Sequence, residues 1–247
     1  MHADIYASAP PLISIIIPTL NEENHIAQVL HTTAQRCAAP DATEIIVVDG
    51  GSSDATMARA HQCTAELQNN GMTLRILSRP KGRARQMNLG AEHALGNILL
   101  FLHADTLLPR HFDRHIRTAL EGEHLTLGAF NLNINADTQV MKWICWWANV
   151  RSRMFALPYG DQALFVRRSD FMRLGMFPAM EIMEDFAFVR KFKRSGGNIS
   201  VLSDEVITSA RRWQKRGCLF TTLCNQIMIL GYYLHIPTRH LARWYRR

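Results

Sequence analysis

The chain has 247 residues, of which 47% are hydrophobic and 20% charged, a composition that excludes a disordered protein and allows a sizeable core. Its net charge of +7 is uneven: residues 1–130 hold 10 basic and 13 acidic side chains, whereas residues 131–247 hold 18 and 8. The basic second half indicates an anionic partner, such as a nucleotide diphosphate, a nucleic acid or an acidic membrane surface.

Strands and helices alternate in the first half of the chain. Residues 13–20 predict a buried strand, and residues 22–35 carry apolar side chains at helical spacing. Further strands are predicted at residues 44–51, 73–78 and 97–103, with helices after the first two of these. This alternation favours an α/β fold with a mostly parallel sheet and helices on both faces. Ligands of such sheets bind outside the carboxyl ends of the strands.

Three of the predicted strands end on polar residues. The first runs into Thr19-Leu20-Asn21-Glu22, the second ends on Asp49-Gly50-Gly51, and the fourth on His103-Ala104-Asp105. Because side chains alternate along a strand, the His103 and Asp105 side chains point the same way. We favour a metal or phosphate site at this edge over three separate solvated turns.

The second half is less regular. Strands are predicted at residues 127–134 and 160–168, and helices at residues 141–155 and 183–196. No linker rich in Pro, Gly or Ser separates the halves, so we expect one domain. Its parts are a nucleotide-binding half (about 1–130), an acceptor and catalytic half (about 131–216), and a C-terminal segment (217–247).

The C-terminal segment is apolar at first and basic at its end. Residues 217–238 contain no Lys, Arg, Asp or Glu and predict an apolar helix. Its length could span a bilayer, but Thr221, Asn225 and Gln226 favour packing, a homodimer or peripheral contact with a membrane. Five cysteines without a C-x-x-C pair, and an N-terminus unlike a signal peptide, favour a cytoplasmic protein, at most peripheral at the inner face of the membrane.

Motifs of several common enzyme classes are absent. No G-x-G-x-x-G follows the first strand, and the sequence has neither a G-x-x-x-x-G-K-[ST] loop nor a G-x-S-x-G elbow. This argues against the usual dinucleotide fold, an ordinary nucleotide triphosphatase and a serine hydrolase. His111 and His115 have the spacing of a metal pair on a helix, but the arginines around them favour a solvated basic face.

Four segments in order resemble the family 2 glycosyltransferases over nearly the whole chain. They are SIIIPTLNEENHIAQVL (14–30), EIIVVDGGSSDAT (44–56), RARQMNLGAEHALGNILLFLHADT (83–106) and MEDFAF (183–188). They are similar, in turn, to the family's P-T-x-N-E turn, its V-V-D-D-G-S-x-D block, its F-L-D-A-D block and its E-D pair. GDQALFVRR, PAMEIMEDF and SARRWQKRG also resemble a small bacterial subgroup associated by name with arsenosugar biosynthesis.

The resemblance implies a GT-A fold and transfer of a sugar from a nucleotide-diphosphate sugar to an acceptor hydroxyl, with no nucleic acid partner. Asp105 would hold a Mn²⁺ or Mg²⁺ ion on the diphosphate, since both ions prefer oxygen ligands. His103 departs from the family's acid and would contact a ribose hydroxyl, a phosphate or the metal. Asp49 would accept the imide N–H of the base, which favours a UDP-sugar. The implied nucleotide-binding residues are Pro18, Thr19, Asn21, Glu22, Asp49, Arg83, Arg85, His103, Ala104 and Asp105.

The resemblance places the chemistry on Glu184 and Asp185. Inverting transfer needs a base that takes the proton of the acceptor hydroxyl. By resemblance that base is Asp185, with Glu184 supporting it or touching the acceptor. Gly160, Asp161 and Gln162 are expected to face the donor sugar or the acceptor, and a cationic, aromatic lid over the diphosphate is expected from Arg211, Arg212 and Trp213.

Two other functions stay open from the sequence. A sugar-phosphate nucleotidyltransferase also uses a nucleotide-binding α/β sheet, but its glycine-rich basic loop is replaced here by PTLNEENH. A non-catalytic protein that binds nucleotide sugars or a membrane would not need the E-D pair, because binding alone requires no base. Neither the donor sugar nor the acceptor is predicted.

Overall fold

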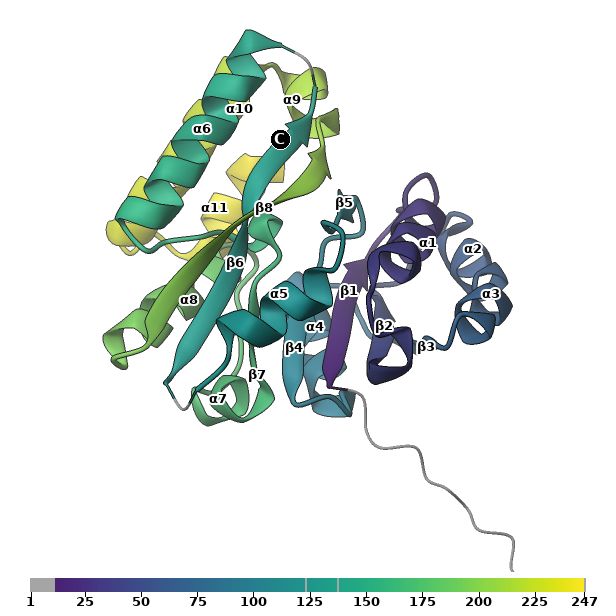
Figure 1. Cartoon of the computed structure of the whole chain (residues 1–247). Helices are drawn as coiled ribbons and strands as arrows, with labels where there is room; N and C mark the ends of the chain where they lie inside the picture. The colour runs from purple at the N-terminus through teal and green to yellow at the C-terminus, as the bar shows by residue number, and fades with distance from the viewer. Residues whose placement is uncertain (1–11, 123, 137, 247) are drawn as a thin grey trace, which may run out of the picture.

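The computed structural model describes residues 12–122, 124–136 and 138–246 (Figure 1). Within them one eight-stranded sheet has the order β3-β2-β1-β4-β7-β6-β8-β5. The strands are β1 (Ile13–Thr19), β2 (Thr43–Asp49), β3 (Thr73–Ser78), β4 (Ile98–Phe101), β5 (Thr106–Leu107), β6 (Thr126–Asn135), β7 (Phe165–Arg167) and β8 (Asn198–Ser209).

Helices cover both faces of this sheet. They are α1 (Ile26–Arg36), α2 (Thr56–Gln62), α3 (Thr64–Asn69), α4 (Arg83–His93), α5 (Phe112–Ala119), α6 (Gln139–Met154), α7 (Arg168–Arg173), α8 (Glu184–Arg194), α9 (Arg211–Arg216), α10 (Cys218–Tyr233) and α11 (Thr238–Arg246), with 3₁₀ turns η1 (Pro40–Ala42) and η2 (Gly160–Gln162). In Figure 1 the helices α1, α2 and α3 lie beside β1 and β2, and α6, α9 and α10 lie at the other end of the molecule.

The alternation of side chains along β1 creates two hydrophobic clusters. Ile15 and Ile17 pack in one cluster with α1, α3 and α5, whereas Ile16 packs in the other with α4, α7 and α8. All three isoleucines have no exposed surface, as expected for a strand covered on both faces. A Cβ at Gly90 would lie 2.5 Å from Ile16 Cγ2, so α4 packs closely on β1 and carries Arg83 to the end of that strand.

The predicted direction is wrong for two strands of the sheet, β7 and β5, whereas β6 and β8 are parallel to each other. β1, β2, β3 and β4 are parallel, but β7 is antiparallel to both β4 and β6, and β5 is antiparallel to β8. The sheet is therefore mixed rather than mostly parallel. The residue pattern of β7 shows that it is buried, but burial does not reveal which strands it pairs with or in which direction.

The apolar helix predicted over residues 217–238 is also wrong in extent. Helix α10 ends at Tyr233, His235 has a left-handed φ of 56°, and α11 begins at Thr238. Gly231 packs under Leu241, where a Cβ would lie 2.5 Å from Leu241 Cδ2, so the two helices form a hairpin. Of the helices in the described part of the chain, none is long and apolar enough to cross a membrane.

Candidate functional site

A cavity of about 720 Å³ lies at the carboxyl ends of β1 and β4. Its walls are the loop after β1, the start of α4, the turn after β4, the start of α8 and the C-terminal helices. The structure therefore brings together residues that are far apart in the sequence. The predicted site residues on its walls are Pro18, Thr19, Glu22, Arg83, His103, Ala104, Asp105, Asp161, Glu184, Asp185, Arg211 and Trp213.

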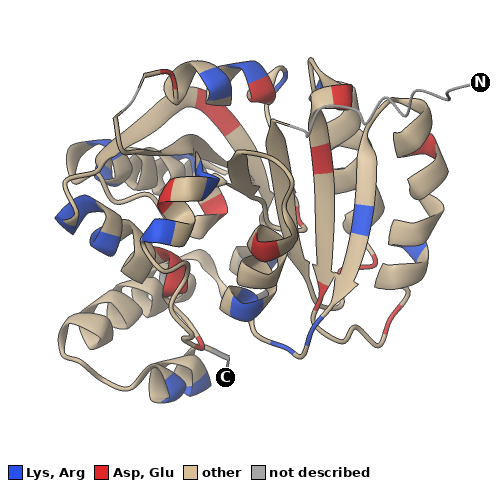
Figure 2. Cartoon of the chain, turned by 90° about the horizontal axis from the view of Figure 1, so that it is seen from below, with Lys and Arg blue, Asp and Glu red and all other residues tan. Residues whose placement is uncertain are grey.

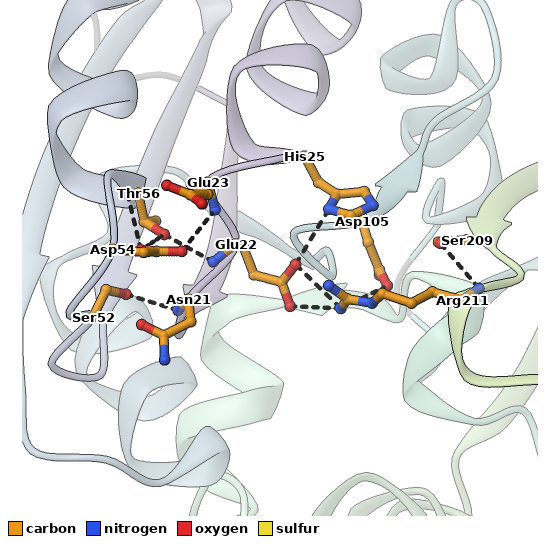
Figure 3. A network of polar contacts seen from close by, with 10 residues as sticks. All are labelled: Asn21, Glu22, Glu23, His25, Ser52, Asp54, Thr56, Asp105, Ser209 and Arg211. Atoms are coloured by element: carbon orange, nitrogen blue, oxygen red, sulfur yellow. Dashed lines mark hydrogen bonds and ion pairs between the residues drawn. The ribbon is translucent and has the colours of Figure 1, made fainter. Parts of the chain in front are cut away.

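One polar network joins the loop after β1 to α9 (Figure 3). Arg211 Nη2 donates to both carboxylate oxygens of Glu22, at 2.9 and 3.2 Å, and lies 3.8 Å from Asp105 Oδ2. The hydrogen bond to Glu22 is the main cause that raises the pKa of Arg211, with Asp105 adding to it. Arg211 thus holds two carboxylates on one side of the cavity.

Asn21 lies behind this network rather than on the cavity wall. Its N–H donates to Ser52 Oγ at 2.9 Å, and its side-chain oxygen accepts from Ser53 N–H at 2.9 Å. Its φ of 55° is left-handed, a conformation that asparagine tolerates better than most residues. Asn21 therefore ties the loop after β1 to the loop after β2, and its predicted contact with the nucleoside has no support in this arrangement.

The carboxylate of Asp49 accepts hydrogen bonds from the turn that follows it. Its carboxylate accepts from Gly51 N–H at 2.9 Å, from Ser52 N–H at 3.0 Å and from Ser52 Oγ at 2.5 Å. The side chain is 5% exposed and does not line the cavity. These hydrogen bonds close the loop after β2, and the expected contact of Asp49 with the base stays a prediction.

Asp105 is the one carboxylate of the turn after β4, and its side chain is 23% exposed in the cavity. Within the described residues, no group of three or more His, Cys, Asp or Glu could hold a metal ion unaided. A single carboxylate beside an open cavity fits an ion such as Mn²⁺ or Mg²⁺ that takes its other ligands from phosphate and water. The protein alone therefore offers part of a metal site.

Arg83 lies at the centre of a second network on the cavity wall. Its Nε donates to Glu184, its Nη2 donates to Asp185 Oδ2 at 3.2 Å, and its Nη1 lies 3.2 Å from His103 Nε2. Burial disfavours the charge of Arg83, but the two carboxylates outweigh this cost and raise its pKa. The neighbouring Arg85 is exposed and does not line the cavity. Of the two arginines expected to bind the nucleotide, only Arg83 therefore lies at the cavity.

The carboxylate of Asp185 accepts from three donors. Besides Arg83, Gly160 N–H donates to Oδ2 at 2.8 Å, and the N–H of Phe186 donates to Oδ1 at 2.8 Å. Burial would raise the pKa of Asp185, but Arg83 and the two backbone donors together lower it below its usual value. The carboxylate is therefore ionised and positioned, as a base must be.

Glu184 is far more buried than Asp185, with a side chain that is 1% exposed against 13%. Its carboxylate accepts a hydrogen bond from Arg83 Nε. A carboxylate with so little exposure can reach an acceptor only poorly, so we assign Glu184 to holding Arg83 rather than to direct contact with a substrate.

The loop before β7 supplies two cavity residues, Tyr159 and Asp161, and one supporting residue, Gln162. Asp161 lines the cavity, its Oδ1 is buried without a partner in the described structure, and burial raises its pKa against the opposing effect of Arg151. Gln162 is fully buried: it accepts from Ser152 Oγ at 2.6 Å and donates to the carbonyl of Phe130 at 2.9 Å. Gln162 therefore shapes the loop and lies off the cavity wall, in contrast to the expectation that it faces the donor sugar or the acceptor.

Two residues of the predicted lid, Arg211 and Trp213, line the cavity. Trp213 lines it, with a buried Nε1 that has no partner in the described structure. The side chain of Arg212 lies outside the described residues. The helices α10 and α11 add Asn225, Met228 and Tyr245 to the wall, none of which was predicted as a site residue.

Gln86 is another site residue that the sequence reasoning missed. It is 4% exposed, lines the cavity, and its Nε2 donates to the carbonyls of Thr19 and Val48 at 2.8 Å each. The signal was present, because Gln86 lies between Ala84 and Met87 on the face of α4 that turns inward. A polar residue on a buried helix face needs a partner, and here it fixes the ends of β1 and β2.

Gly160 allows the close approach of Asp185, which gives a first testable prediction. A Cβ at residue 160 would lie 2.6 Å from Asp185 Oδ2, so Gly160→Ala must displace the carboxylate and weaken the 2.8 Å hydrogen bond. We expect turnover to fall by about 10²-fold, the usual cost of a misplacement near 1 Å. Steady-state kinetics measure this, and calorimetric titration with UDP should give an affinity close to wild type. Normal turnover would show that the position of Asp185 is not critical.

Comparisons with known proteins agree with this fold. The model of the family described as glycosyl transferase family 2 matches residues 14–176. An undecaprenyl-phosphate 4-deoxy-4-formamido-L-arabinose transferase of Proteus mirabilis is 33% identical over 112 residues, which cover 44% of this chain and 34% of that protein. The chain thus spans about a third of the length of the curated relatives it matches.

Two solved structures are similar in fold. A mannosyltransferase from Pyrobaculum calidifontis, in complex with GDP-Man and Mn²⁺, has a TM-score of 0.69 and 21% identity and covers 90% of this chain and 64% of its own. TarS of S. aureus in complex with UDP has a TM-score of 0.64 and 20% identity, with coverage of 80% and 60%. At this identity the likeness shows a GT-A-like fold with a mixed sheet flanked by helices.

Proposed function

Because the chain belongs to glycosyl transferase family 2 and is a glycosyltransferase, we propose that it moves a sugar from a nucleotide-diphosphate sugar to an acceptor hydroxyl, with inversion. The observation that carries the proposal is the arrangement of one cavity. Asp105 with Arg211 and Asp185 with Arg83 all line it. A diphosphate between two arginines, next to an ionised carboxylate, is the arrangement that this reaction requires.

The donor in this proposal is a UDP-sugar. The support is indirect, since TarS was solved with UDP and the mannosyltransferase with GDP-Man, and Asp49 is turned away from the cavity. Both nucleotides therefore belong in the assay. A cavity of about 720 Å³ lies within the range of small-molecule sites.

In the proposed mechanism Asp185 takes the proton from the acceptor hydroxyl as that oxygen attacks the anomeric carbon. The bond from this carbon to the diphosphate breaks in the same step, and the negative charge that appears on the leaving group is met by Arg83 and Arg211. Asp105 would hold Mn²⁺ or Mg²⁺, which when bound supplies further positive charge to the diphosphate. His103, next to Arg83, would help to orient that group.

A turnover assay separates this function from its rivals. The protein is incubated with UDP- and GDP-sugars, a panel of hydroxyl acceptors, and Mn²⁺ or Mg²⁺, and the free nucleotide diphosphate is measured. We expect release of UDP with metal and loss of release with a chelator. A nucleotidyltransferase would release pyrophosphate from a nucleoside triphosphate instead. A non-catalytic protein would bind UDP without releasing it from any sugar.

The panel should include small sugars of the kind suggested by the resemblance to the subgroup associated by name with arsenosugar biosynthesis. It should also include polyprenyl phosphates, because the relative from Proteus mirabilis is named for undecaprenyl phosphate. We propose a small hydroxyl acceptor as the natural one. Transfer only to a polyprenyl phosphate would replace that part of the proposal.

We further propose that α10 and α11 contact an anionic membrane surface at the inner face of the membrane. On α10, Phe220, Leu223 and Leu230 are 55 to 58% exposed. The sequence contains no Asp or Glu after Glu205, and Figure 2 shows basic residues in the helix beside the C-terminus. A second copy would bring like charges together, whereas anionic lipid complements an apolar and basic surface.

Flotation with anionic vesicles tests this contact. We expect the wild-type chain to float and Leu223→Glu/Leu230→Glu to stay in solution, since each carboxylate opposes burial in the interface. Neutral vesicles are the matched control and should bind less. Light scattering on the same samples detects the alternative, a homodimer that ignores vesicles and is broken by the same double substitution.

A further inference from the structure

The guanidinium group of Arg83 contacts three partners. Its Nε edge faces Glu184, and its two terminal nitrogens face Asp185 and His103, each at 3.2 Å. An arginine only donates, so His103 Nε2 accepts in this arrangement. The same terminal nitrogens border the cavity in which the diphosphate is proposed to bind, and the Arg83 side chain is 38% exposed there.

The two carboxylates depend on Arg83 to different degrees. Glu184 is 1% exposed, and a buried charge that loses its partner is strongly destabilising. Asp185 is 13% exposed and keeps the N–H groups of Gly160 and Phe186 at 2.8 Å when Arg83 turns away. The guanidinium can therefore release Asp185 while Nε stays on Glu184.

We propose that the donor's diphosphate takes the terminal nitrogens of Arg83 from Asp185, while Glu184 keeps the Nε edge, so that Asp185 is freed to act as base only after the donor has bound. This inference rests on the function proposed above. Glu184 is then a positioning residue, which acts through Arg83. The donor is required to bind first, and the acceptor meets an active base only in the loaded enzyme.

The surroundings of Asp185 support this sequence of events. Arg83 is the strongest influence that lowers its pKa, and His103 acts in the same direction, whereas Asp161 and Tyr159 face it from the loop before β7. A carboxylate that shares an arginine is a weaker proton acceptor than one that does not. Moving the guanidinium to the diphosphate strengthens the base at the moment when the leaving group needs the positive charge.

The proposal makes Asp185 and the diphosphate competitors for Arg83, and this competition can be measured without turnover. Calorimetric titration of the full chain with UDP and Mn²⁺ compares wild type with Asp185→Asn. We expect the variant to bind UDP about three- to tenfold more tightly, the scale of a charge-assisted hydrogen bond reduced by partial exposure. The matched control is Glu181→Gln, which removes another carboxylate of the cavity wall, one that accepts a hydrogen bond from Thr238 at 2.8 Å.

A double-mutant cycle identifies Arg83 as the cause. Asp185→Asn is repeated in the Arg83→Gln background, where we expect the gain in UDP affinity to disappear. Should Arg83→Gln melt well below wild type because Glu184 loses its partner, Arg83→Lys replaces it, since one ammonium group cannot serve both carboxylates in the same way.

The outcomes are distinct. A gain in UDP affinity that persists without Arg83, or an equal gain from Glu181→Gln, would mean that the loss of any negative charge near the cavity favours UDP. Either result would overturn the proposed transfer of Arg83 from Asp185 to the diphosphate, but not the proposed function. No gain from Asp185→Asn, with UDP bound normally by wild type, also overturns it. Absence of binding by both UDP and GDP would overturn the proposed function together with this inference.

Discussion

Replacement of Asp185 by Asn is expected to reduce turnover by about 10² to 10⁴-fold, the usual value of general-base assistance. The substitution keeps the size of the side chain and one acceptor oxygen for the N–H groups of Gly160 and Phe186. It removes the atom that takes the proton. The measurement is kcat with a nucleotide sugar and the acceptor found in the assay, at saturating donor.

Stability must be checked in the same variant, because an amide NH₂ will face one of the two backbone donors. The loss expected from this is about 1 to 2 kcal/mol. Since the pKa of Asp185 is lowered in the folded protein, the contribution of its charge to stability is present at neutral pH and is lost as the pH falls through that lowered value. A comparison of the variants at pH 7 therefore includes the whole effect.

Near-normal turnover in Asp185→Asn would place the base elsewhere. From the sequence the next candidate is Glu184, but its burial and its pairing with Arg83 argue against it. The structure points to Asp161 instead, because this residue lines the cavity, has one buried oxygen without a partner in the described structure, and has a pKa raised by burial. Asp161→Asn would then show the large loss.

Positions at the ends of strands could be predicted from the sequence. Burial of β1 and β4 and the period-2 alternation of side chains identified His103 and Asp105 as neighbours at one edge of the sheet, and both line the cavity. The E-D pair was identified by resemblance and lies in the same cavity. The placement of these residues at one cavity could be predicted because it depends on local pattern and on the general geometry of α/β sheets.

The partners of these residues could not be predicted. Arg211 meets Glu22 across 189 positions of sequence, and Arg83 meets Glu184 across 101. Such contacts depend on how β7, β6 and β8 are ordered in the sheet, which side-chain periodicity does not encode. The hydrogen bonds of Asp49 are local by contrast, and a residue two or three positions after an aspartate is often its partner in a turn.

Replacement of Asp105 by Ala is expected to abolish the effect of metal on donor binding. Asp105 is the carboxylate at the end of β4 that would hold Mn²⁺ or Mg²⁺, and the described residues provide no larger cluster that could replace it. We expect UDP affinity in the presence of Mn²⁺ to fall by about tenfold or more, as even changes to the residues around metal ligands cost 10- to 100-fold. Without metal, wild type and variant should bind UDP alike.

Arg211 makes this experiment more specific. In wild type its guanidinium lies between Glu22 and Asp105, so the metal and Arg211 compete for the same carboxylate until the diphosphate attracts Arg211. Glu22→Gln is the matched control: it removes the stronger partner of Arg211 but leaves Asp105, so the response to Mn²⁺ should be kept. Titrations of UDP with Mn²⁺ and with a chelator, on both variants and wild type, measure the response. If Asp105→Ala still binds UDP more tightly when Mn²⁺ is present, the metal is held elsewhere, and His103 with the diphosphate becomes the site to test.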